Sequence, residues 1–132
     1  MNATDMTDAT PLTGLRVLVA EDEALIAMLL EDMLEELGAE VLGPVNSSSE
    51  AFRLIDAGPP DAATLDVNLR GDTVYGPALE LHRRGVPLVF VSGYGDLPDC
   101  PEELAGAVRL KKPFRLDELA AALAQAIRQS TG

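Results

Sequence analysis

A chain of 132 residues with 47% hydrophobic residues is long enough to bury one core without disulfides, and Cys100, its single cysteine, could form none internally. A formal net charge of −12 argues against nucleic-acid binding, which needs a basic face for the phosphates. No apolar run reaches the roughly 20 residues that cross a membrane, so we expect no membrane association and a cytoplasmic location.

The first part of the chain is predicted to lack regular structure. Residues 1–13 are rich in Asn, Thr, Asp and Ala, and we expect a disordered leader there. This stretch also lacks the basic and apolar segments of a signal peptide.

Strands and helices are predicted to alternate along the rest of the chain. Short apolar runs predict five strands, over residues 15–20, 40–45, 62–66, 86–91 and 107–110. Helical spacing and capping residues predict four helices, over 24–37, 50–57, 74–84 and 114–129. Asp22 is placed to cap the first helix, any helix within 96–106 is short, and 130–132 form a tail.

This alternation predicts an α/β fold with parallel strands, right-handed crossovers and helices on both faces of the sheet. Runs such as 17–19 and 88–91 place apolar residues on both sides of the pleat, as in strands that are buried on both faces. The chain shows no internal repeat or linker, so we expect one domain over residues 14–129.

Residues that could take part in catalysis or ligand binding lie at the carboxyl ends of four of the five predicted strands. They are the acidic run 21–23, then Asp66, Ser92, and Lys112 with Pro113. The carboxyl ends of parallel strands share one edge, where open α/β sheets bind their ligands. Clustered carboxylates suit Mg²⁺, an aspartate can become an acyl phosphate, and a lysine offsets phosphoryl charge. The four positions together therefore favour a phosphoryl-transfer site.

Each of these residues also has an ordinary structural explanation. Asp66 could cap the following turn, and the acids 21–23 could favour a helix start through its dipole. Ser92 is a common turn residue, Lys112 a common surface charge, and Pro113 suits the first turn of a helix. Only their joint arrival at one edge distinguishes the two interpretations.

The order of these motifs resembles the receiver domain of bacterial two-component response regulators, over about residues 14–129. The resemblance implies a flavodoxin-like, doubly wound five-stranded parallel sheet with strand order 2-1-3-4-5. It implies that Asp66 is the phosphorylated residue. It also implies Mg²⁺ as cofactor, held by Asp22 directly, by Glu21 through water, by Asp66 and by the backbone carbonyl of Asn68.

The resemblance implies roles for three further residues. Ser92 turns toward the phosphoryl group, Lys112 pairs with its oxygens, and the Lys112–Pro113 bond is a candidate cis peptide. The chain departs from the common pattern at Glu21, where aspartate is commoner, and at Arg109, where an aromatic switch residue is usual.

Two stretches resemble a variant subfamily of stand-alone receivers. They are residues 68–75 and the run 90–95, which is similar to that subfamily's Phe-Ala-Thr-Gly-Tyr-Gly motif. Tyr94 in this run is a candidate to replace the aromatic missing at Arg109, although it could equally pack there without a switching role.

We therefore expect a single-domain response regulator that accepts a phosphoryl group on Asp66 from a histidine kinase or histidine phosphotransfer protein. Its output would be contact with an unidentified downstream protein, or phosphorelay, and it would catalyse only its own phosphorylation and dephosphorylation. One alternative is a receiver-like module that is never phosphorylated. A less favoured one is an Asp-nucleophile phosphatase, which commonly needs an acid where Asn68 stands.

Overall fold

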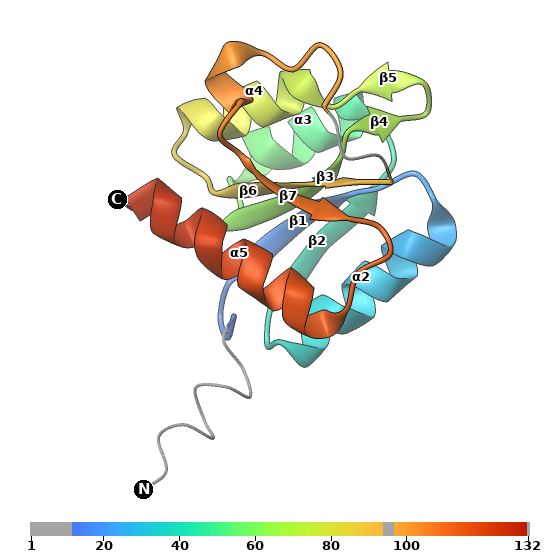
Figure 1. The fold of residues 1–132 in the computed structure, drawn as a ribbon, viewed down its shortest axis with the longest axis vertical. Helices are drawn as coiled ribbons and strands as arrows, with labels where there is room; N and C mark the ends of the chain where they lie inside the picture. The colour runs from blue at the N-terminus through green and yellow to red at the C-terminus, as the bar shows by residue number, and fades with distance from the viewer. Residues whose placement is uncertain (1–11, 94–96, 132) are drawn as a thin grey trace, which may run out of the picture.

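The computed structural model describes residues 12–93 and 97–131. Its main sheet has five parallel strands in the order β2-β1-β3-β6-β7 (Figure 1). The strands are β1 (Arg16–Ala20), β2 (Glu40–Val45), β3 (Ala62–Asp66), β6 (Leu88–Ser92) and β7 (Val108–Lys111). Counted within this sheet alone, the order is 2-1-3-4-5, so the predicted topology is confirmed.

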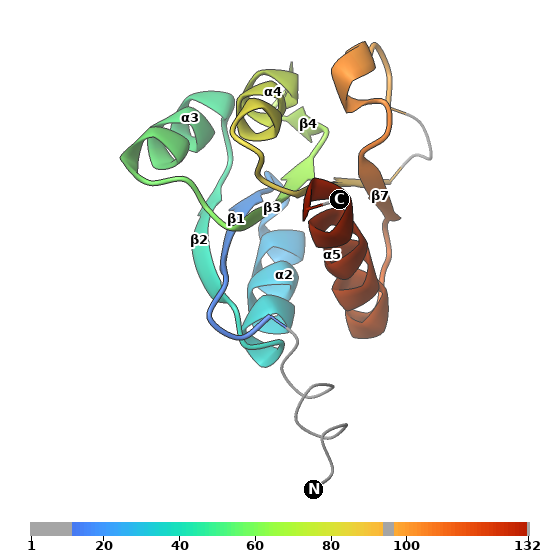
Figure 2. The same cartoon turned by 90° about the vertical axis from the view of Figure 1, so that its left-hand side faces the viewer.

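The helices form two layers on opposite faces of this sheet (Figure 2). One layer holds α2 (Ala24–Glu36) and α5 (Leu116–Thr131). The other holds α3 (Ser48–Ala57), α4 (Tyr75–Arg83) and the 3-10 turn η1 (Glu102–Leu104). Helices on both faces are what the alternating sequence predicts, and η1 agrees with the expectation of only a short helix between the last two strands.

Alternate residues of the central strands pack into the two layers. In β1, Val17 and Val19 contact the core under α2 and α5, whereas Leu18 and Ala20 contact the core under α3 and α4. The residues of β6 alternate in the same way. Both faces of these strands are therefore buried, which explains why their sequences are continuously apolar rather than alternating.

The structure corrects the predicted leader at its C-terminal end. Leu12 is buried in the core, and its N–H donates to the carbonyl oxygen of Leu37 at 3.0 Å. The N–H of Gly14 donates to the carbonyl of Gly38 at 3.4 Å, so the chain is tied down just before β1. The rest of the predicted leader, residues 1–11, lies outside the described residues.

The predicted C-terminal tail is also wrong in part, because α5 continues through residues 130 and 131. The hydroxyl of Ser130 donates to the carbonyl of Gly85 at 2.8 Å, so the helix end contacts the turn before β6. In the described ranges 12–93 and 97–131, no helix is long and apolar enough to span a bilayer.

A short antiparallel hairpin follows β3 and was not predicted. It consists of β4 (Asn68–Leu69) and β5 (Asp72–Thr73), which are joined by Arg70 and Gly71. Both joining residues have positive φ, 51° for Arg70 and 84° for Gly71, as tight turns require. The hairpin lies at the carboxyl edge of the sheet, directly after Asp66 (Figure 1).

Candidate functional site

Three strands deliver the central residues of the site to one edge of the sheet. Asp66 is the last residue of β3, and Glu21 directly follows β1, where its N–H donates to the carbonyl of Val45 at 2.9 Å. Lys112 directly follows β7, and its N–H donates to the carbonyl of Ser92 at 2.8 Å. The parallel ladders therefore fix these side chains close together, as the sequence predicts.

The acidic side chains form a compact group. Glu21, Asp22 and Asp66 each offer a carboxylate oxygen, and these oxygens lie within 4.8 Å of one another. Glu21 is only 2% exposed and Asp66 only 9%, whereas Asp22 is exposed. Three acids this close repel one another, so the arrangement needs cations to be stable.

Lys112 supplies one positive charge within this group. Its ammonium Nζ lies 3.1 Å from Glu21 Oε2, 3.1 Å from Asp66 Oδ2 and 2.8 Å from Glu23 Oε1. Its side chain is only 13% exposed, so the ion pairs with the buried Glu21 and Asp66 are shielded from bulk water, whereas the Glu23 partner is exposed. The peptide bond between Lys112 and Pro113 is cis, the geometry that the resemblance implies.

The electrostatics of the site shift the pKa values of two groups. Burial, with the hydrogen bond and charge of Asp66, raises the pKa of Glu21 to about 7, although Glu23 N–H and Lys112 oppose this. Burial by itself would lower the pKa of Lys112, but hydrogen bonds to Glu23 and Glu21 and the nearby carboxylate charges raise it overall. Lys112 is therefore a permanent cation, while Glu21 is balanced between its charged and neutral forms near neutral pH.

Backbone donors fix the orientation of each carboxylate. Asp66 Oδ1 accepts from the N–H of Asn68 at 3.1 Å, and Glu21 Oε2 accepts from the N–H of Glu23 at 3.1 Å. Asp22 Oδ2 accepts from the N–H of Arg70 at 3.0 Å. The prediction that Asp22 caps the first helix is therefore wrong, because its carboxylate is drawn to the β4–β5 turn and Glu23 takes the N-cap position.

The donor set fits a magnesium ion. Glu21 Oε1 is buried and, among the residues that the structure describes, has no hydrogen-bond partner. An unpaired buried carboxylate oxygen is costly unless a cation or a bound water satisfies it. Oxygen ligands from one or two carboxylates, completed by water and substrate phosphate, are what Mg²⁺ prefers.

An open pocket with a volume of about 550 Å³ lies at this edge of the sheet, and five of the predicted site residues line it. Those brought together there are Asp22, Asp66, Asn68, Ser92 and Lys112. Arg109 does not line the pocket: it lies on β7, exposed, paired with Phe90 in the sheet. Tyr94, the candidate replacement aromatic, falls outside the described residues.

This pocket has a contact beside it, between Pro98 and Tyr75, that was not predicted from the sequence. Pro98 lines the pocket from the β6–β7 connection, and its carbonyl accepts a 2.6 Å hydrogen bond from the hydroxyl of Tyr75. The Tyr75 ring packs edge-on against Phe90, with centroids 6.0 Å apart. Burial, with Cys100 and Asp99 nearby, raises the pKa of Tyr75, so its phenol stays a donor. The only sequence signal for the Tyr75–Pro98 hydrogen bond was a tyrosine at the start of a predicted helix.

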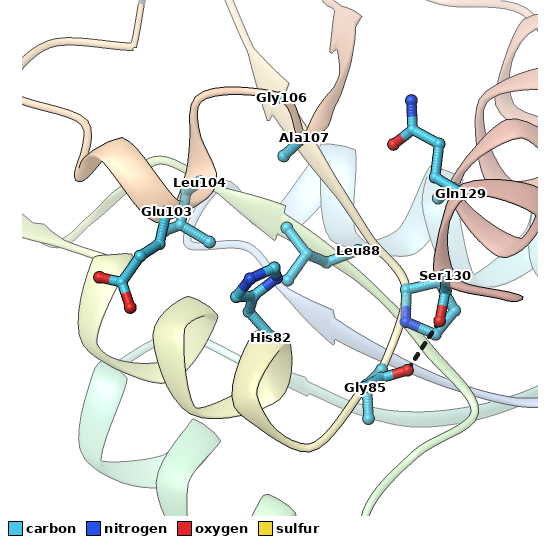
Figure 3. Close-up of a pocket in the computed structure, with 12 residues that line it drawn as sticks. His82, Gly85, Leu88, Glu103, Leu104, Gly106, Ala107, Gln129 and Ser130 are labelled. Carbon is cyan, nitrogen blue, oxygen red and sulfur yellow. Dashed lines mark hydrogen bonds between the residues drawn. The ribbon is translucent and has the colours of Figure 1, made fainter. Parts of the chain in front are cut away.

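A second pocket, of about 400 Å³, lies where β6 and β7 begin, at the edge of the sheet opposite the acidic site. It lies between the ends of α4 and α5 and the η1 turn, with His82, Glu103 and Gln129 among its lining residues. A hydrogen bond from Ser130 to Gly85 joins two of its lining residues (Figure 3). None of the site residues described above lines it, so it is separate from the acidic site.

The match to a family model settles the class of protein. The response regulator receiver domain matches residues 17–124. This chain belongs to the response regulator receiver family.

Individual relatives agree with this receiver assignment. PdtaR, a transcriptional regulatory protein of Mycobacterium tuberculosis, is 34% identical over 124 residues, covering 92% of this chain and 60% of PdtaR. The chain thus spans about 60% of the length of this curated relative. SdrG of Sphingomonas melonis Fr1, solved in solution, is 39% identical with a TM-score of 0.76, covering 89% of this receiver and 98% of SdrG.

A third relative bears on the metal. The receiver domain of the sensor histidine kinase PA1611 of Pseudomonas aeruginosa PAO1 is 28% identical, with a TM-score of 0.75 over 88% of this chain and 99% of that one. That domain was crystallised with a magnesium ion coordinated in its active-site cleft. This receiver also carries a cluster of acids, Glu21, Asp22 and Asp66, whose oxygens are close enough to hold one ion.

Proposed function

We propose that this receiver accepts a phosphoryl group on Asp66 from a histidine kinase or a histidine phosphotransfer protein, in a Mg²⁺-dependent reaction. The observation that carries the proposal is the placement of Asp66, at the end of β3, between the acids Glu21 and Asp22 and the ammonium of Lys112. A carboxylate held against a cation in an open pocket is suited to attack a phosphorus atom.

In the proposed transfer, an Asp66 carboxylate oxygen forms a bond to phosphorus as the phosphorus–nitrogen bond of the phosphohistidine breaks. The imidazole leaves with the electron pair of that bond. Lys112, already 3.1 Å from Asp66, offsets negative charge on the transferred oxygens. In this proposal Ser92, which lines the same pocket, donates a hydrogen bond to one of them. A bound Mg²⁺ would supply further charge neutralisation; its ligands would be Asp22 and Asp66, the Asn68 carbonyl, and Glu21 through water.

The receiver would then catalyse only the gain of this group and its later hydrolysis, acting in the cytoplasm as a signalling protein. Output would pass to an unidentified downstream protein, by contact or by phosphorelay. The segment after Ser92 is the candidate output surface, because it begins at the pocket and is tied to α4 through the Tyr75–Pro98 hydrogen bond.

The experiment that tests the proposal is intact mass after incubation with acetyl phosphate, with and without Mg²⁺. We expect a Mg²⁺-dependent gain of one phosphoryl group that Asp66→Asn abolishes. Asp72→Asn, the same chemical change at an exposed position in the adjacent hairpin, should load normally. Loading of Asp66→Asn would overturn the assignment. Repeated turnover of a small phosphate ester would instead favour the phosphatase alternative.

This receiver has a surface beside the site to which a phosphodonor protein could bind. Helix α2 begins directly after Glu23, and its first turns expose Leu25 by 80% and Met28 by 59%. Leu25 and Met28 are three residues apart and so adjacent on the helix surface, and grouped exposed apolar side chains indicate a protein–protein contact. A partner bound on this face would hold its phosphohistidine near the pocket.

We therefore expect Leu25→Ser to slow phosphoryl transfer from a phosphotransfer protein that loads the wild type by about tenfold, as at an interface hot spot. Loading by acetyl phosphate should stay at the wild-type rate, because Leu25 lies outside the pocket. Phe52→Ser, which alters an exposed apolar residue on α3, is the control. Equal transfer rates for the two variants would place the partner elsewhere.

A further inference from the structure

Glu23 is the third acid of the 21–23 run, and its side chain neither caps α2 nor belongs to the proposed metal site. Its carboxylate Oε1 lies 2.8 Å from the ammonium of Lys112, closer than the 3.1 Å contacts to Glu21 and Asp66. We propose that Glu23 is a positioning residue that restrains Lys112 in the unphosphorylated protein and thereby slows phosphorylation of Asp66. This inference rests on the proposed function.

The first argument is the number of donors on the lysine. An ammonium group has three N–H donors, and here Glu21, Glu23 and Asp66 each accept from it. A phosphoryl oxygen arriving at Asp66 therefore meets a lysine with no donor to spare. One of the three contacts has to break before Lys112 can pair with the new group.

Burial decides which contact breaks. The Glu21 side chain is fully buried, so its carboxylate cannot exchange the lysine for water. Asp66 carries the new group and remains beside Lys112. The Glu23 side chain is 63% exposed, so water can replace the lysine there at little cost. Glu23 is thus the partner that the phosphoryl group displaces.

The local backbone shows that the Glu23 side chain serves Lys112 and not its own helix. Glu23 occupies the N-cap of α2 with an extended backbone, yet its side chain makes no capping hydrogen bond. An aspartate at an N-cap normally accepts from a backbone N–H two or three residues later. Glu23→Asp should therefore shift the carboxylate toward the helix and away from Lys112 while preserving the charge.

The experiment compares initial rates of phosphorylation by acetyl phosphate at saturating Mg²⁺. We expect Glu23→Asp and Glu23→Gln to load about two- to fivefold faster than the wild type, the effect of losing one partly exposed ion pair. Glu35→Gln, the same charge change at an exposed position of α2, should load at the wild-type rate. The Glu23→Asp increase should vanish in a Lys112→Met background, because the restraint acts only through the lysine.

The outcomes distinguish two effects of the Glu23 carboxylate: restraint of Lys112, and electrostatic repulsion of the anionic phosphodonor. Faster loading of Glu23→Gln alone, with Glu23→Asp unchanged, would show repulsion and overturn the proposal. Unchanged rates in both variants, in a wild type that loads, would also overturn it and leave the proposed function intact. Absence of loading in the wild type would instead contradict the proposed function.

A second measurement needs no phosphorylation. The Lys112 ammonium, held by three acceptors, should give a slowly exchanging Nζ proton signal by NMR in the metal-free protein. Glu23→Asp should speed that exchange, whereas Glu35→Gln should not. Identical exchange in Glu23→Asp and wild type would overturn the restraint even where loading rates differ.

Discussion

Lys112→Met should lower the free energy of unfolding of the metal-free protein by about 3–5 kcal/mol, the range for a buried ion pair that loses one partner. The substitution keeps an unbranched chain of similar length but leaves Glu21 and Asp66, 3.1 Å from the missing ammonium, without their shared cation. Protonation of Glu21, whose pKa is already raised to about 7, limits the loss toward the lower end at acidic pH. The measurement is urea denaturation in EDTA at pH 7.5.

The neighbouring residue provides a matched control. Lys111→Met makes the same chemical change one position earlier, on β7, where the side chain is exposed. We expect it to change stability by less than about 0.5 kcal/mol. Added Mg²⁺ should restore part of the stability of Lys112→Met, because a cation among the acids replaces the lost charge. Equal stability of the two variants in EDTA would show that Lys112 does not hold the acids together.

Sequence patterns predicted the parts of this molecule that depend on local order and on topology. The apolar runs of β1 and β6 marked strands buried on both faces, and the alternation with helices implied parallel order. Once the strands are parallel, Asp66 and Lys112 must share an edge, whatever the details of packing. These inferences use only the periodicity of the chain and the handedness of crossovers.

The choice among possible side-chain partners could not be predicted in this way. Asp22 has the right type and spacing for an N-cap, but the N–H of Arg70, 48 residues away, holds its carboxylate. The β4–β5 hairpin that supplies this donor is too short to leave a periodic signal. The Tyr75–Pro98 bond likewise joins residues 23 apart. In each case several local partners are chemically adequate, and tertiary geometry selects a distant one.

Glu21→Gln should make the metal-free protein more stable above pH 7, by on the order of 3 kcal/mol, since a pKa difference of one corresponds to about 1.4 kcal/mol. Burial and the neighbouring Asp66 raise the pKa of Glu21 from 4.5 to about 7 in the folded protein. Between these values the folded state holds a proton that the unfolded state releases. The contribution of protonated Glu21 to the free energy of unfolding is therefore fully present below pH 4.5 and is lost as the pH rises through 7.

A glutamine at this position carries no charge, so the free energy of unfolding of Glu21→Gln should decline less with rising pH than that of the wild type. Thermal unfolding in EDTA at pH 5, 7 and 8 measures it: wild type and Glu21→Gln should be similar at pH 5 and diverge at pH 8. Glu36→Gln, at an exposed position near the end of α2, should follow the wild type throughout. Parallel pH curves for wild type and Glu21→Gln would show that ionisation of Glu21 does not destabilise the folded protein.

Bound Mg²⁺ should reverse the effect of Glu21 ionisation on stability. Mg²⁺ should stabilise the wild type more at pH 8 than at pH 6, because its binding requires the charged form of Glu21, whose Oε1 otherwise lies buried without a partner among the described residues. Glu21→Gln should gain much less from the ion at either pH. The carboxylate that costs stability in the empty protein is then the one that makes binding of the ion favourable, and an undiminished Mg²⁺ shift in Glu21→Gln would remove Glu21 from the metal site.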